Sequence, residues 1–187
     1  MDTATAVLRK EHEAILKMLA VTEEVARRLE GGERIAPETL ANLIQFFRLF
    51  ADKCHHGKEE DLLFPQLEKK GMLRAGGPIR VMLTEHEQGR RLVQQMAEAT
   101  EAYPNQPETV GPAWAQAARG YAALLRAHID KENNVLFVMA ERMLTPEEQT
   151  ALAEGFEKIE VEKMGVGTHE RLHAMMAGLV KDFLPPR

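Results

Sequence analysis

One pattern of eleven residues occurs twice in this chain of 187 residues, and its histidines and glutamates limit the folds that the chain can adopt. The copies are residues 55–65, HHGKEEDLLFP, and residues 128–138, HIDKENNVLFV; they align without a gap as His-x-x-Lys-Glu followed by an apolar run. A Glu-His-Glu triplet precedes each copy, at residues 11–13 and 85–87, with its histidine 43 residues before the first copy and 42 before the second. The pattern therefore indicates one unit of two segments that is used twice.

The residue content and the positions of Gly and Pro predict helices throughout. Aromatic residues make up only 5% of the chain, the helix formers Ala, Leu, Met, Glu and Arg are abundant, and strand-like alternation is nowhere sustained. The breakers predict helices near residues 4–30, 38–70, 78–102, 108–143, 146–164 and 168–183. Since short loops favour antiparallel neighbours, we expect an all-α fold, an up-down-up-down four-helix bundle over residues 1–143, with additional C-terminal helices, residues 144–187, packed on it.

Composition and charge exclude several classes of protein. With 44% apolar and 28% charged residues the chain falls in the ordinary globular class, and its net charge of -5 argues against nucleic acid as a partner. The longest apolar run, residues 135–140, is too short to span a membrane, and the N-terminal residues lack the regions of a signal peptide. The single cysteine, Cys54, permits no internal disulfide. We therefore expect a cytoplasmic protein without membrane contact.

The neighbours of each histidine predict which way it faces, because residues three, four, seven and eight positions apart share one side of a helix. By this test His12, His86 and His128 share their faces with aliphatic and aromatic side chains and are expected to point inward. His55 also has apolar neighbours, whereas His56 shares its face with charged residues. His55 is therefore predicted to be the inward member of the pair.

In each repeat a glutamate, Glu59 or Glu132, follows the inward histidine by four residues. Residues at this spacing lie one helical turn apart, with Cβ atoms about 5 to 6 Å from one another. Both carboxylates are therefore expected to be buried, which is costly unless they are protonated or meet a cation, and a bound metal removes that cost. An alternative register, in which His56 and Glu60 take these places, stays open.

These inward residues predict a dinuclear metal site at the centre of the bundle. Imidazole and carboxylate ligands without thiolate favour iron or manganese over zinc, and six protein ligands leave coordination positions open. The predicted ligands are His12, His55, Glu59, His86, His128 and Glu132.

The ordered set of a histidine and then His-x-x-x-Glu, found twice, resembles the hemerythrin-like (HHE cation-binding) family. The resemblance covers residues 1–143 and implies a four-helix bundle with two iron ions (Fe2+/Fe3+), with an oxo or hydroxo bridge as an option. The oxygen carriers of that family have a second histidine where this chain has Arg90 and an aspartate where it has Asn133. The chain is more similar to the bacterial branch with four histidines and two glutamates, which includes iron–sulfur repair proteins and proteins that respond to oxygen, peroxide or nitric oxide.

The resemblance leaves three functions open. The first is a protein, monomer or homodimer, that binds or senses O2, H2O2 or NO at the open dinuclear site. The second is a di-iron enzyme with peroxidase, catalase-like or nitric-oxide-reducing activity. The third is iron storage or repair, or a structural metal site. Repeated turnover of the ligand separates the second from the first, and failure to bind any added ligand indicates the third.

Two further residues are candidates for a role beside the metals. Tyr121 lies two turns before the His128 position on the same face, where it can donate a hydrogen bond or relay a radical, although core packing also accounts for it. If the last helix lies across the opening of the bundle, His169 can supply a further ligand nitrogen or move a proton. A partly exposed histidine on a helix face is the plainer alternative for His169.

Overall fold

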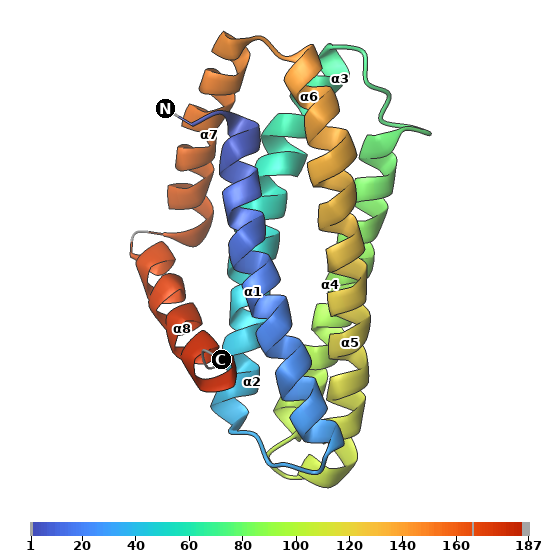
Figure 1. Cartoon of the computed structure of the whole chain (residues 1–187), viewed down its shortest axis with the longest axis vertical. Helices are drawn as coiled ribbons and strands as arrows, with labels where there is room; N and C mark the ends of the chain where they lie inside the picture. The colour runs from blue at the N-terminus through green and yellow to red at the C-terminus, as the bar shows by residue number, and fades with distance from the viewer. Residues whose placement is uncertain (1, 166, 185–187) are drawn as a thin grey trace.

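The computed structural model describes residues 2–165 and 167–184, except for the side chains of Met164 and His169, and every regular element in these ranges is helical (Figure 1). None of the helices within these ranges combines the length and apolar character needed to cross a membrane.

Four long helices form the bundle, and consecutive ones run in opposite directions (Figure 1). This confirms the predicted all-α, up-down-up-down architecture. The second and fourth helices each contain π-helical stretches, labelled η. The helices are α1 (Ala4–Glu30); α2 (Pro37–Phe46), η1 (Phe47–His56), η2 (Glu59–Leu63) and α3 (Phe64–Lys69); α4 (Pro78–Ala102); and α5 (Pro107–Lys131), η3 (Glu132–Leu136) and α6 (Phe137–Met143).

The π-helical turns are the part of the helices that the sequence pattern did not predict. The backbone N–H of Phe64 donates to the carbonyl of Glu59, and that of Phe137 donates to the carbonyl of Glu132, so both bonds join residues five apart. A π turn holds one residue more than an α turn. Pro65, which has no backbone N–H, follows the first of these turns. The repeat has Val138 there and keeps the π turn, so proline alone does not cause it.

Two apolar clusters divide the interior of the bundle. One contains Trp114, Phe46 and Met96, and the other contains Phe64 and Phe137; all five side chains are buried. Along each long helix the inward histidines and glutamates fall between the residues of the two clusters. A polar layer therefore crosses the bundle between two apolar regions.

The last two helices, α7 (Pro146–Met164) and α8 (Thr168–Phe183), lie along the outside of the bundle (Figure 1). Both contact α1, and α7 also contacts η1 and η2. The capping box between Thr145 and Glu148 begins α7. Phe156 of α7 is 1% exposed and belongs to the same apolar cluster as Phe64. The core of the bundle thus includes a side chain from α7.

Replacing Phe156 with alanine is expected to destabilise the whole chain by about 3–5 kcal/mol, because the change leaves a cavity in a shared core. Urea unfolding followed by circular dichroism measures this loss. The control is Val161→Ala on the same helix, where the side chain is 58% exposed and the expected change is within about 0.5 kcal/mol. Equal effects of the two substitutions would show that α7 does not share the core.

Candidate metal centre

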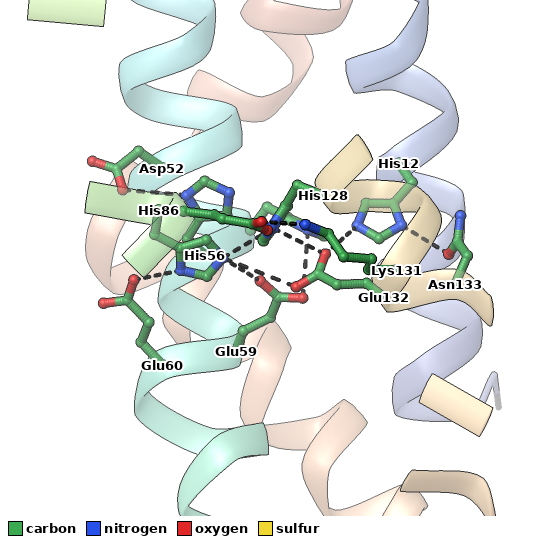
Figure 2. Close-up of polar contacts among 12 residues, drawn as sticks. His12, Asp52, His56, Glu59, Glu60, His86, His128, Lys131, Glu132 and Asn133 are labelled. Atoms are coloured by element: carbon green, nitrogen blue, oxygen red, sulfur yellow. Dashed lines mark hydrogen bonds and ion pairs between the residues drawn. The ribbon is translucent and has the colours of Figure 1, made fainter. Parts of the chain in front are cut away.

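The fold brings all six predicted ligand residues to one level of the bundle, where their side chains are buried. Figure 2 shows His12, Glu59, His86, His128 and Glu132 at this level. They come from every long helix, as the repeat predicted. The residues are His12 on α1, His55 on η1, Glu59 on η2, His86 on α4, His128 on α5 and Glu132 on η3. A seventh residue, His56 on η1, joins them.

The prediction that only His55 of the adjacent pair points inward is wrong. His56 is 3% exposed, its ring stacks on that of His86 with centroids 3.8 Å apart, and its centroid lies 5.7 Å from that of His55. The physical reason is the π-helical turn: the backbone N–H of Gly57 donates to the carbonyl of Asp52, five residues earlier. The wider turn lets two consecutive side chains face the interior, which the α-helical face test does not allow.

Two of the histidines are held through Nδ1 by the residue that follows a glutamate of the motif. The Nδ1 of His12 lies 2.9 Å from Oδ1 of Asn133, and the Nδ1 of His86 lies 2.7 Å from Oε1 of Glu60 (Figure 2). Both bonds direct the opposite ring nitrogen, Nε2, to the centre of the bundle. Such hydrogen bonds orient a histidine and fix its tautomer for metal binding. Glu60, the alternative ligand in the shifted register, thus points to His86 rather than to the centre.

His55 is held by a buried chain of charged groups. The Nδ1 of His55 lies 2.9 Å from Oε2 of Glu11, whose other oxygen accepts a hydrogen bond from Lys58. Lys58 is 1% exposed and also lies 3.3 Å from Oε2 of Glu160 on α7. Burial opposes the charge of Lys58, but Glu11 outweighs it and raises the pKa of the ammonium group. The ammonium therefore stays charged next to the histidine that it helps to orient.

The second repeat has the same arrangement. The Nδ1 of His128 lies 2.9 Å from Oε2 of Glu85, and Lys131 donates to the other oxygen of Glu85. Lys131 is 39% exposed, in contrast to its buried counterpart in the first repeat. The Glu-His-Glu triplets and the shared Lys of the motif were the sequence signal for these supporting residues. Their role could not be assigned without knowing which helices are adjacent.

Most of the atoms that face the centre lack hydrogen-bond partners, except Nε2 of His86 and Nε2 of His128, which lie 3.1 Å from each other. Glu132 Oε2 lies 3.2 Å from Nε2 of His12 and from Nε2 of His128, and Glu59 Oε2 lies 3.5 Å from Nε2 of His86. Unpaired buried polar atoms are rare and costly, so their convergence calls for a cation. Within the described residues the unpaired atoms at the centre are Nε2 of His12 and His55 and both carboxylate oxygens of Glu59 and Glu132. Nδ1 of His56 is also unpaired, but it lies on the side of Asp52, 3.5 Å from Oδ1 of that residue.

The donor atoms form two groups, each with its atoms within 4.8 Å of one another. Both groups fit a metal ion, since each combines imidazole nitrogens with carboxylate oxygen, and Glu59 is shared between them. The first group is His56, Glu59, His86 and His128; the second is His12, His55, Glu59 and Glu132. The two positions therefore differ, with three histidines at one and two at the other.

The pKa values of the two central glutamates express the cost of burying them together. Burial raises the pKa of Glu59 well above its ordinary value, and the neighbouring Glu132 raises it further. Burial also acts to raise the pKa of Glu132, but His128 and His12 outweigh it and lower that pKa. Burial lowers the pKa of His55 to about 4, so this imidazole is neutral at pH 7 and available as a ligand. Without a metal ion, the shared burial therefore favours a proton on Glu59.

A third group of potential ligands, Glu11, Cys54 and Glu160, already contains a cation in the ammonium group of Lys58. Burial raises the pKa of the Cys54 thiol to about 12, so the thiol stays protonated. Cys54 is therefore a small buried residue of the core.

Of the two candidates for a role beside the metals, the structure describes the side chain of Tyr121 but not that of His169. Tyr121 is buried in the apolar cluster that contains Trp114, with its ring packed edge-on against Phe47 at 4.7 Å between centroids. Burial raises its pKa, so the phenol keeps its proton. The side chain of His169 lies outside the described part of the structure, and its proposed role stays a prediction.

A buried layer of histidine and glutamate inside an antiparallel four-helix bundle defines the class of metal-binding helical bundle proteins. The sequence model of the hemerythrin HHE cation binding domain matches residues 3–140, which include all seven of these residues. The chain belongs to the hemerythrin HHE cation-binding family.

Similar proteins are known from several bacteria. The uncharacterized proteins Rv1995 of Mycobacterium tuberculosis and Mb2018 of Mycobacterium bovis are each 28% identical over 163 residues, which is 87% of this chain and 63% of theirs. The iron-sulfur cluster repair protein YtfE of Salmonella newport is 40% identical over 90 residues, which is 46% of this chain and 40% of YtfE. The chain thus spans less than two thirds of the length of these relatives. No solved structure matches it.

Replacing Lys58 with methionine is expected to cost about 3–5 kcal/mol of stability, because it leaves the carboxylate of Glu11 buried without its ammonium partner. The matched control is Lys131→Met, at the equivalent and partly exposed position of the second repeat, where about 0–1 kcal/mol is expected. Urea unfolding of the two variants tests the difference. Equal losses would show that burial does not distinguish the two ion pairs.

Proposed function

We propose that this protein is a non-haem di-iron protein that binds or senses O2, peroxide or nitric oxide at a dinuclear site with open coordination positions. The observation that carries the proposal is the convergence of unpaired, buried imidazole and carboxylate atoms between two apolar clusters. The site residues would be His12, His55, His56, Glu59, His86, His128 and Glu132. Iron bound there would supply one-electron chemistry and affinity for small diatomic ligands.

The surrounding residues support this proposal by their number and their orientation. Five imidazoles and two carboxylates offer at most about nine donor atoms, against about twelve positions on two six-coordinate ions, so ligand positions remain. Glu11, Glu60, Glu85 and Asn133 hold four of the rings through Nδ1. The apolar clusters on both sides exclude bulk water. Such exclusion slows the entry of water and protons, which drive autoxidation of the reduced metal.

Two observations favour other functions for the same site. Tyr121 lies in the cluster next to the centre and is a possible hydrogen donor for an enzyme. The similarity to the iron-sulfur cluster repair protein YtfE favours iron donation or repair. Repeated consumption of peroxide or nitric oxide would indicate the enzyme. Transfer of iron to an apo iron–sulfur protein, without turnover of either ligand, would indicate repair.

Iron content is the first test of the proposal. Protein purified without added metal is expected to hold about two irons per chain, and Glu59→Gln and Glu132→Gln are each expected to lower this content at least about twofold, because a neutral amide replaces a charged ligand. Elemental analysis provides the measurement. The control is Glu13→Gln, an exposed acid one residue from His12. Unchanged iron in both variants would contradict the assignment of the glutamates.

The role of His56 has its own test. The second repeat has Ile129 at this position, so His56→Ile introduces a side chain that the same fold already accepts. Since only one of the two ligand groups contains His56, iron is expected to fall from about two toward about one per chain. Elemental analysis with Mössbauer spectra of the remaining iron measures the change. Two irons with unchanged spectra would mean that His56 is a core residue only.

A further inference from the structure

The two repeats differ in chemistry at one corner of the bundle, between η1 and α4. The halves correspond in space, since Glu85, His128 and Lys131 repeat the contacts of Glu11, His55 and Lys58. When the repeats are aligned on their histidines, the small or polar residues at this corner occupy the positions that large aliphatic residues occupy in the other half. The pairs are His56 with Ile129, Asp52 with Leu125, Gly89 with Ile15, Arg90 with Leu16, and Val93 with Leu19.

A cavity of about 240 Å³ lies at this corner. Gly89, Arg90 and Val93 of α4 line one side of it, and His56 and Tyr121 are also in its wall. At the corresponding corner of the other half, Ile15, Leu19, Leu125 and Ile129 are buried in the core, and Leu16 is partly buried against it. The cavity thus lies where Asp52, Gly89 and Val93 have smaller side chains than their counterparts in the other half.

The inner end of the cavity reaches the candidate metal centre through His56. This side chain is buried, its Nδ1 has no hydrogen-bond partner, and that nitrogen lies 3.5 Å from Oδ1 of Asp52 (Figure 2). The ring stacks on His86, another residue of the same ligand group. A molecule in the cavity is therefore separated from the centre by side chains and not by a helix.

The outer end is covered by side chains that join the two helices. The Nε of Arg90 donates to Oδ1 of Asp52 at 2.8 Å, and its Nη2 donates to Oε1 of Glu60 at 2.7 Å. Nearer the surface Arg48 donates to Gln94 at 2.8 Å. These partly exposed contacts can open without any change in the backbone. Arg90 is already paired with two carboxylates. Its guanidinium group therefore attracts an anion to the opening only weakly.

Gly89 is the residue that leaves the space. Glycine inside a helix costs about 1 kcal/mol relative to alanine, so its presence in the middle of α4 needs a reason. A Cβ atom at Gly89 would lie 3.4 Å from Cε2 of Tyr121, which is ordinary van der Waals contact. Alanine therefore fits without strain and would occupy space beside the cavity.

We propose that this cavity is the path by which a small uncharged ligand, such as a diatomic gas, reaches the metal centre, with Arg90 as its cover. The inference rests on the proposed function, because it assumes that the centre takes an external ligand. Phe47, Val93 and the ring of Tyr121 form an apolar part of the wall. The arginines of the wall are already paired, Arg90 with Asp52 and Arg48 with Gln94, which favours an uncharged molecule over an ion.

The test compares two glycines. Gly120 of α5 is also inside a helix, and its Cβ would likewise lie 3.4 Å from a neighbouring side chain, Leu92, away from the cavity. Stopped-flow spectra would record nitric oxide binding to the reduced, iron-loaded full chain. Gly89→Ala is expected to slow association a few-fold and Gly89→Leu about tenfold, whereas Gly120→Ala leaves it unchanged at equal iron content. Equal rates in Gly89→Ala and Gly120→Ala would overturn the proposal.

A second measurement needs neither iron nor a reaction. In the zinc-loaded chain, xenon is expected to shift the methyl NMR signals of Val93, and Gly89→Ala should weaken that shift while Gly120→Ala does not. The absence of any xenon shift in the unmodified chain would contradict the proposal that this cavity is the path of the ligand. If the chain holds iron but never binds nitric oxide, the proposed function is contradicted. The xenon experiment then still tests whether the cavity takes up an uncharged molecule. Azide association that responds to Gly89→Ala as strongly as nitric oxide does would overturn the preference for uncharged ligands.

Discussion

The structure depends on the cost of burying two carboxylates, those of Glu59 and Glu132, in the middle of an apolar bundle. An unpaired buried carboxylate is unfavourable by several kcal/mol, about as much as the whole stability of many domains. Here the compensating groups surround the carboxylates at short range, with Nε2 of His12 and His128 both 3.2 Å from one oxygen of Glu132. The layer makes sense as a metal site, because a divalent cation satisfies the histidine and glutamate atoms together.

The rest of the bundle holds this layer in position. Two apolar clusters enclose it, and Glu11 and Glu85 fix the rings of His55 and His128 from neighbouring helices. On one side the contact continues through Lys58 to Glu160, so α7, which lies outside the region matched by the family, is connected to the support of a site histidine. The helix on the outside of the bundle thus contributes to stability through Phe156 and to the polar layer through Glu160.

The asymmetry between the repeats gives the site its chemical character. Two equal halves would offer two equal metal positions, but His56 adds a nitrogen to only one of them. The same corner has Gly89 and Arg90 where the other half has isoleucine and leucine, and it is there that a cavity reaches the buried layer. A difference in candidate ligands and a difference in the space beside them therefore coincide.

The sequence by itself determined the helices, the repeat and six of the seven converging residues. Helix periodicity and Gly–Pro breakers are local, so the ends of α1, α4 and α7 lie within a residue or two of their predicted positions. It did not determine the direction of His56, because the face test assumes α-helical turns and η1 has wider ones. Nor could it assign Glu11, Lys58 and Glu160 to one chain of contacts, since these residues lie on three different helices. Only the tertiary structure decided which side chains support each histidine, because hydrogen bonds across a bundle depend on which helices are neighbours and at what level they meet.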